Sequence, residues 1–102
     1  MIVVITTTPT AEAAELLAEK IVIERLAACV QVIPQVRSFY YWQGEVRKES
    51  ECLLLIKTLA EKYDEIENFI RSNHSHSVPE IVAIEAERFF DGYGDWVKNY
   101  LT

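Results

Sequence analysis

Two long strand-forming segments, on either side of Gln43 and Gly44, constrain the fold more than any other feature of the sequence. Residues Cys29–Trp42 and Glu45–Thr58 each have the pattern of one strand, and the Gln-Gly pair between them predicts a hairpin turn. A strand of about 14 residues spans roughly 45 Å, whereas most strands have about five or six residues. We therefore expect the tip of this hairpin to project beyond the sheet that its base helps to form.

The expected tip carries four consecutive aromatic residues, Phe39, Tyr40, Tyr41 and Trp42. Because side chains alternate along a strand, Phe39 and Tyr41 should lie on one face, and Tyr40 and Trp42 on the other. Aromatic side chains of this kind are typical anchors of protein interfaces, and an unpaired strand edge tends to recruit a partner. We predict that these four residues form an interface between copies of the chain. The alternative is that they fold back on their own domain, under a helix near the C-terminus.

The segments around the hairpin alternate between strand-like and helix-like patterns. They are a strand at Ile2–Ile5, a helix that follows Thr8 and Pro9, a helix at Ala60–Ser72, a strand at Ile81–Glu87 and a short C-terminal helix that contains Tyr93, Trp96, Val97 and Tyr100. The order β-α-β-β-α-β with a tail helix is typical of a ferredoxin-like α+β sandwich. Residues 1–102 are expected to form one domain.

Two prolines predict which strands lie at the edges of the sheet. Proline cannot donate to a strand ladder, so the strand that contains Pro34 and the strand that begins after Pro79 belong at edges. The first and third strands have continuous apolar runs, as strands with neighbours on both sides should. All these features agree with the ferredoxin-like order.

The start of the first helix has an apparent cap. Thr8 is expected to cap it, with Pro9 in the first helical position. Ala14, Leu17 and Ile21, together with Ala18, should form its inward stripe, which Val22, Ile23 and Leu26 widen.

Composition and charge argue against several classes of function. The formal net charge is −6 and no basic face is visible, so nucleic acid is not an expected partner. No apolar run reaches the roughly 20 residues of a membrane span, and the N-terminal residues do not resemble a signal peptide. We expect a cytoplasmic protein with reduced thiols. Phosphate-loop, CxxC, HExxH and nucleophile-elbow motifs are absent, so an enzyme is not expected.

Several motifs in order closely resemble the CutA divalent-cation-tolerance family. They are Leu26–Gln31, Ser38–Val46, Glu51–Thr58, His74 with Val78–Ile81, and Tyr93 with Trp96. The resemblance implies a ferredoxin-like subunit in a tight homotrimer whose chains exchange long strands. It also implies tolerance of copper and other divalent cations, and an architecture similar to that of the PII signalling proteins. Four positions depart from the family pattern: Gln31, Ser75-His76 and Phe89 stand where the family usually has Asn, Pro-Tyr and Gly.

Candidate metal ligands are His74, His76, Cys29 and Glu80. An x-His-x-His pattern on an extended segment points both imidazoles the same way, and imidazole suits copper, zinc and nickel. Thiolate favours copper(I), although a free cysteine is more often a small buried apolar residue, as expected for Cys52. The two histidines could equally belong to an ordinary surface loop.

Further carboxylates and a lysine complete the set of candidates. Glu49 and Glu51 could provide oxygen ligands, or could simply be solvated surface residues. Lys57 could pair with a carboxylate or extend its amine to solvent.

Three functions are compatible with these features. The first is a trimeric divalent-cation tolerance protein that binds copper-like ions, with possible Cu²⁺ and no obligatory cofactor. The second is a PII-like signalling module that binds a small ligand between subunits. The third is a structural trimer that acts through protein partners.

Overall fold

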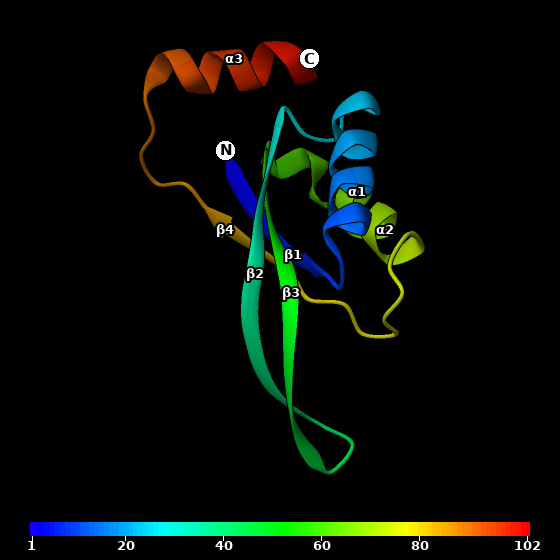
Figure 1. Cartoon of the computed structure of the whole chain (residues 1–102). Coiled ribbons are helices and arrows are strands. Elements are labelled where there is room, and N and C mark those ends of the chain that lie inside the picture. Colours follow the sequence, from blue (N-terminus) through cyan, green and yellow to red (C-terminus); the bar gives the residue numbers. More distant parts are fainter.

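The computed structural model describes all 102 residues, and its centre is a four-stranded antiparallel sheet with the strand order β2-β3-β1-β4 (Figure 1). The elements are β1 (Ile2–Thr8), α1 (Ala11–Ile23), β2 (Cys29–Trp42), β3 (Glu45–Thr58), a 3-10 turn (Ala60–Lys62), α2 (Tyr63–Ser72), β4 (Ile81–Glu85) and α3 (Asp91–Leu101). This order confirms the ferredoxin-like α+β fold with a long hairpin and a C-terminal helix. No helix is long and apolar enough to cross a membrane.

The predicted places of the strands are confirmed. β1 and β3 are central, and β2 and β4, the strands associated with Pro34 and Pro79, lie at the edges. The ladder between β2 and β3 is irregular near Pro34, because its register shifts between Ile33 and Val36. Gln35 has a φ of 60°, so the backbone turns into the left-handed region there. The shift adds one residue to β2 and reverses the alternation of its side chains beyond that point.

The core lies between the sheet and helices α1 and α2, which cover one face (Figure 1). The strands contribute residues such as Val4, Leu54 and Ile56, and the helices contribute Ile21 and Ile66. All five side chains are fully buried.

The opposite face of the sheet is apolar but largely open. Val82 and Ile84 of β4 are 48% and 53% exposed, and Ile33 of β2 is also exposed. Val82 and Ile84 lie beside Ile5 and Val3 of β1 on this face. The chain therefore leaves one side of its sheet without a covering layer.

The predicted start of α1 is wrong by two residues. Thr10, not Thr8, caps the helix, because its Oγ1 accepts a hydrogen bond from the N–H of Ala13 at 3.1 Å. Thr8 still belongs to β1, where it pairs with Cys52, and its hydroxyl donates to the carbonyl of Thr10 at 2.9 Å. Pro9 consequently precedes the cap and is not the first helical residue.

Three other boundaries and faces differ from the expectations. β4 ends at Glu85 and not at Glu87, and α2 begins only after the 3-10 turn. Ala14, Leu17 and Ile21 are buried as predicted, whereas Ile23 at the end of α1 is exposed. Ile23 lies two residues after Ile21, which places it about 200° around the helix and therefore outside the stripe that faces the sheet.

The hairpin projects from the sheet as predicted, and we call its outer part, residues 36–51, the arm (Figure 1). Gln43 and Gly44 have φ values of 50° and 83°, as in the tight turns that match strand twist. Phe39 and Tyr41 are 61% and 72% exposed, so these rings are not packed on their own domain. The tail helix α3 lies at the other end of the molecule from the arm (Figure 1). The alternative in which this helix covers the aromatic residues is therefore wrong.

Candidate functional site

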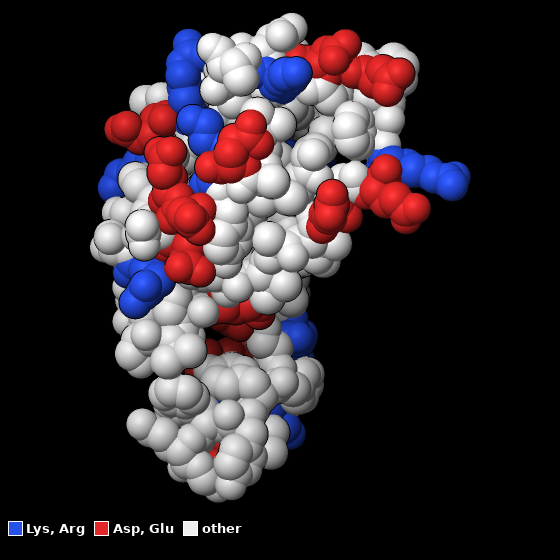
Figure 2. All heavy atoms as spheres, turned by 180° about the vertical axis from the view of Figure 1, so that it is seen from behind, with Lys and Arg blue, Asp and Glu red and all other residues white.

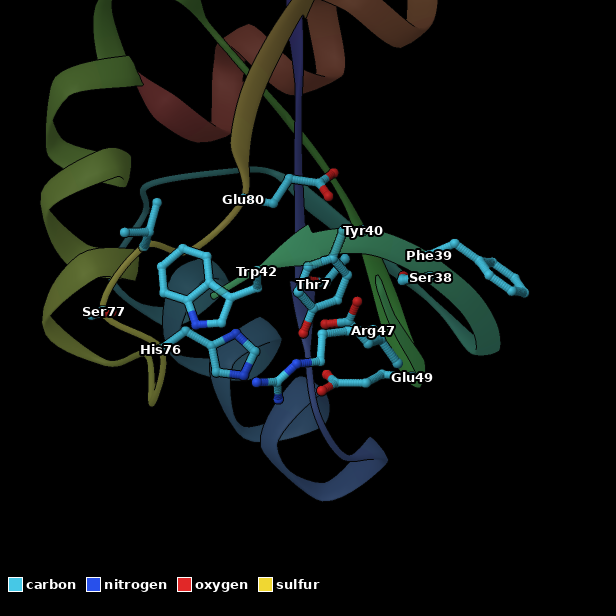
Figure 3. A pocket seen from close by; sticks show the side chains of 12 residues that line it. Thr7, Ser38, Phe39, Tyr40, Trp42, Arg47, Glu49, His76, Ser77 and Glu80 are labelled. Atoms are coloured by element: carbon cyan, nitrogen blue, oxygen red, sulfur yellow. The ribbon is translucent and has the colours of Figure 1, made fainter. Parts of the chain in front are cut away.

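The main cavity lies where the arm leaves the sheet, between the arm and the segment 76–80 that precedes β4 (Figure 3). Its volume is about 520 Å³. Seen from behind, a hollow separates the tip of the arm from the body, and acidic side chains lie inside it (Figure 2). The cavity is open to solvent, and its walls come from Thr7 of β1, from the arm and from the segment 76–80.

The arm provides most of the wall through side chains on one face. Tyr40 pairs with Arg47 across the hairpin, and Ser38 pairs with Glu49. Together with Trp42, these side chains line the cavity (Figure 3). These side chains point to the same side as the open face of the sheet. The register shift near Pro34 reverses the alternation of β2 and so brings its side chains to that side.

The cavity has more negative than positive groups. Glu49, Glu51 and Glu80 line it, against the single guanidinium of Arg47. The Nε of Arg47 lies 3.0 Å from an oxygen of Glu45, outside the cavity, in the one ion pair of the chain. The contact between these two groups does not have the geometry of a hydrogen bond. The enclosed Nε of Arg47 therefore has a negative charge nearby but no hydrogen-bond acceptor.

The carboxylate of Glu49 also affects Tyr40. The pKa of Tyr40 is raised above its ordinary value, first because its hydroxyl interacts as a donor with Glu49, and then by desolvation and the negative charges of Glu49 and Glu51. Tyr40 therefore keeps its proton and can donate to an acceptor in the cavity.

His74 attaches the segment after α2 to the sheet. Its Nε2 lies 2.6 Å from the carbonyl oxygen of Thr7, and its Nδ1 accepts a hydrogen bond from the backbone N–H of His76 at 3.0 Å. These partners assign the proton to Nε2, which donates to Thr7. Both ring nitrogens of His74 are thus engaged within the chain. A metal ion could bind His74 only after one of these bonds opened.

His76 lies beside His74 but faces the cavity (Figure 3). The two ring centroids are 4.9 Å apart, with the planes tilted by 57°. The backbone at residues 75–78 bends and is not extended, so the side-by-side arrangement comes from a turn and not from strand alternation. Glu80 lines the same cavity as His76.

Cys29 lies elsewhere, at the end of the sheet near α3. It pairs with Lys57, which pairs in turn with Val3 of β1, whereas His74 contacts Thr7 of the same strand. Four residues of a strand span about 13 Å, so Cys29 and His74 cannot share a metal ion within one chain. Cys52 is buried in the core, as expected.

The surroundings of Cys29 form a second polar group of side chains. The pKa of Tyr93 is raised, mainly by burial and then by the neighbouring thiol of Cys29. Lys57 donates to the side-chain carbonyl of Gln31, and its amine lies 5.8 Å from the centre of the Tyr93 ring. Lys57 therefore pairs with an amide and not with a carboxylate.

The structure brings together only part of the predicted set of metal ligands. His74 and His76 are adjacent and Glu80 shares a cavity with His76, but no group of three or more His, Cys, Asp or Glu side chains could hold a metal ion within the chain. Sequence reasoning missed Arg47 and Thr7 as cavity residues. The hairpin pairing of Arg47 with Tyr40 was the signal that could have indicated the first of them.

Comparisons with known proteins agree on one family. Residues 2–100 match the family model described as CutA1 divalent ion tolerance protein. The chain is 42% identical over 98 residues to the chloroplastic Protein CutA of Arabidopsis thaliana, covering 96% of this chain and 54% of that protein. It is 41% identical to the Divalent-cation tolerance protein CutA of Thermus thermophilus, covering 95% and 94%. The chain thus spans about half the length of the plant relative and nearly all of the bacterial one.

Solved structures show the same fold. The chain superposes on the periplasmic divalent cation tolerance protein CutA of Archaeoglobus fulgidus with a TM-score of 0.96 and 32% identity, covering 100% of both chains. It superposes equally well, with a TM-score of 0.96 and 39% identity, on CutA1 of Oryza sativa, covering 99% of this chain and 93% of that one.

Proposed function

The chain belongs to the CutA1 divalent ion tolerance family, and from this premise we propose that it is a homotrimeric protein that binds copper-like divalent cations and has no enzymatic activity. The family match over residues 2–100 is the observation that carries this proposal. The names of the relatives refer to tolerance of divalent cations, and the chain has side chains that bind such ions in proteins.

The proposed metal site combines side chains from neighbouring chains. His76 is the better placed of the two histidines, because no hydrogen bond engages its ring, whereas both nitrogens of His74 have partners. Glu80 can supply an oxygen from the same cavity. Cys29 is too far away within one chain, so it can take part only through a site that a second subunit completes. Such a site agrees with the absence of a three-ligand group in the single chain.

Two features support the homotrimer. The open face of the sheet leaves Ile33, Val82 and Ile84 exposed, and the arm leaves Phe39 and Tyr41 exposed. Burying apolar surface of this extent favours association. We place the four arm aromatics, Phe39 to Trp42, in the contacts between chains.

We also place the protein in the cytoplasm. Both cysteines are free, and Cys52 is buried and unpaired, as is usual in a reducing compartment. Relatives differ in their compartment, since the Arabidopsis protein is chloroplastic and the Archaeoglobus protein is described as periplasmic.

A PII-like module that binds a small ligand is the second candidate, and the cavity of about 520 Å³ favours it. Thermal-shift measurements with metal ions, nucleotides and other anions separate the two functions. A nucleotide that stabilises the protein more than any metal ion would favour the second, and indifference to all ligands would favour a structural trimer.

Calorimetric titration of Cu²⁺ tests the metal proposal. We compare the unaltered protein with His74→Ala, His76→Ala, Cys29→Ala and a His74→Ala/Cys29→Ala double variant, and use Glu19→Gln, an exposed carboxylate on α1, as the control. Loss of one ligand of a metal site should weaken binding by at least about tenfold. His76→Ala should have the largest single effect. Equal, weak binding by all of these proteins would contradict the assignment of these ligands.

A further inference from the structure

The cavity at the base of the arm is lined by a carboxylate that has no partner within the chain. Glu51 is only 8% exposed and lines the cavity, yet it makes no hydrogen bond or ion pair within the chain. The fully buried side-chain atoms without a hydrogen-bond partner are Thr6 Oγ1 and Arg47 Nε, so the carboxylate oxygens of Glu51 are not fully enclosed and are accessible to a ligand in the cavity. Glu49 and Glu80 also lack an ion pair and line the same space.

The three carboxylates do not converge on a point. No three acidic, histidine or cysteine side chains of the chain are placed to hold one metal ion. They are instead distributed around a cavity of about 520 Å³, which is the size of a site for a small organic molecule. This arrangement suits an extended cation better than a metal ion.

Aromatic rings form the other part of the wall. Tyr40 and Trp42 both face the cavity from β2 (Figure 3). The faces of such rings attract cations and also provide apolar contact area. Arg47, the one cation of the wall, is already paired with Glu45. The negative charge of Glu49, Glu51 and Glu80 therefore remains for a ligand.

We propose that this cavity binds a small primary amine in its ammonium form, with the ammonium group on Glu51 and an apolar body against Trp42 and Tyr40. A primary ammonium ion has N–H donors for the carboxylate of Glu51, which a quaternary ammonium ion lacks. An anion would meet three carboxylates, so the nucleotides and other anions of the thermal-shift comparison are expected to bind outside this cavity. This site goes beyond the proposed metal function. It shares the cavity with His76 and Glu80 of the proposed metal site, but its main contact is Glu51, which is not among the proposed metal ligands. Because Tyr40 and Trp42 are also placed in the contacts between chains, a neighbouring chain would form part of its wall in the homotrimer.

The two tryptophans allow a direct test by NMR. Each gives one indole N–H signal, and Trp42 lies in the cavity whereas Trp96 lies on α3, at the other end of the molecule (Figure 1). The full chain is titrated with 2-phenylethylammonium in the presence of a metal chelator, and a Trp96→Phe variant assigns the signals. The Trp42 signal should shift in a saturable way while the Trp96 signal stays in place.

Two matched probes and three variants complete the test. 2-Phenylethanol has the same apolar body without charge, and 3-phenylpropionate has the opposite charge; neither should saturate the Trp42 shift. Glu51→Gln should weaken binding by at least about tenfold, because it removes a charged acceptor and keeps the shape of the side chain. Glu49→Gln should weaken it less, and Glu19→Gln on the outer face of α1 should leave it unchanged.

Several results would overturn the proposal. They are a Trp42 signal that does not move, an equal response to the alcohol or to the carboxylate, or unchanged binding by Glu51→Gln. Because the chelator removes metal ions from the NMR titration, its result does not depend on copper binding. Either proposal can therefore fail while the other stands.

Discussion

Polar side chains at the two ends of the sheet differ in whether they have hydrogen-bond partners within the chain. His74 uses both ring nitrogens within the chain, and Lys57 donates to Gln31, whereas Glu51, which is only 8% exposed and lines the cavity, has no partner within the chain. A buried polar group that is satisfied stabilises the fold, and one that is not satisfied points to a missing ligand. The two kinds of residue therefore have different predicted roles, structural for His74 and ligand-binding for Glu51.

Tyr93 carries a prediction at the scale of one residue. Its pKa is raised in the folded protein by burial and by Cys29, so the fold favours the protonated phenol. Its contribution to stability is complete below the unfolded pKa of about 10 and is lost as the pH rises through the higher folded pKa. Tyr93→Phe should therefore reduce the fall in unfolding free energy as the pH rises above about 10, because it removes this titration.

Urea unfolding at fixed protein concentration measures the effect. The slope between pH 7 and 8.5, where tyrosines remain protonated, serves as the internal control. Part of the alkaline fall should persist in the variant, since the pKa values of Tyr40 and Tyr63 are raised as well. An unchanged alkaline slope would show that Tyr93 does not ionise in this range.

At the scale of the element, the arm depends on its turn and its bulge. The turn at Gln43 and Gly44 reverses the chain with two left-handed residues and sets the pairing of Trp42 with Glu45. The shift near Pro34 then decides which side chains of β2 face the cavity. Before the shift, Cys29 and Ile33 of β2 lie on the open face of the sheet, opposite Lys57 and Leu53 of β3. After the shift, Tyr40 and Trp42 lie on that face instead.

Gly44→Ala tests the turn. The φ of Gly44 is 83°, and an added Cβ would meet no atom within 4 Å, so its effect is confined to the backbone. The variant should lose about 1 kcal/mol of unfolding free energy, the cost of a left-handed conformation for an L-residue. Urea denaturation at fixed protein concentration provides the value.

Gln43→Asn is the matched control, because asparagine tolerates the left-handed conformation that Gln43 adopts at a φ of 50°. It should keep or raise stability. If Gly44→Ala were as stable as the unaltered protein, the turn would have to relax to another conformation.

At the scale of the whole molecule, a single chain leaves two apolar surfaces without cover. One is the open face of the sheet and the other is the projecting arm (Figure 1). The extents of 45 × 25 × 22 Å show how far the arm lengthens the molecule. A small domain gains stability when copies of it bury such surfaces together.

Sedimentation equilibrium at micromolar concentration tests the homotrimer. The chain has a mass of 11.8 kDa, so the trimer should have a mass of about three times that value. Phe39→Ser/Tyr41→Ser should shift the population towards lighter species, because it removes two exposed rings from the arm. Ile23→Ser, on the exposed end of α1, should not. A single species of 11.8 kDa in the unaltered protein would contradict the trimer.

Much of the fold could be predicted from local features. Pro34 and Pro79 indicated the edge strands, and the apolar runs of β1 and β3 indicated the central ones. Gln43 and Gly44 indicated the turn. These predictions succeed because proline, glycine and apolar alternation act on the backbone within a few residues of their own position. The cap at Thr8 failed because pairing with Cys52, far along the chain, extends β1 through that residue.

The cavity depends on contacts between distant segments. Alternation alone separates Phe39 and Tyr41 from Tyr40 and Trp42, but the bulge of one residue in β2 determines which pair faces Glu49 and Glu51. The side chain of His76 reaches this space because its neighbour His74 forms a hydrogen bond with the carbonyl oxygen of Thr7, which is more than 60 residues away along the chain. Local propensities do not encode register or long-range contacts, so the chain had to fold before these charges and rings could share one space.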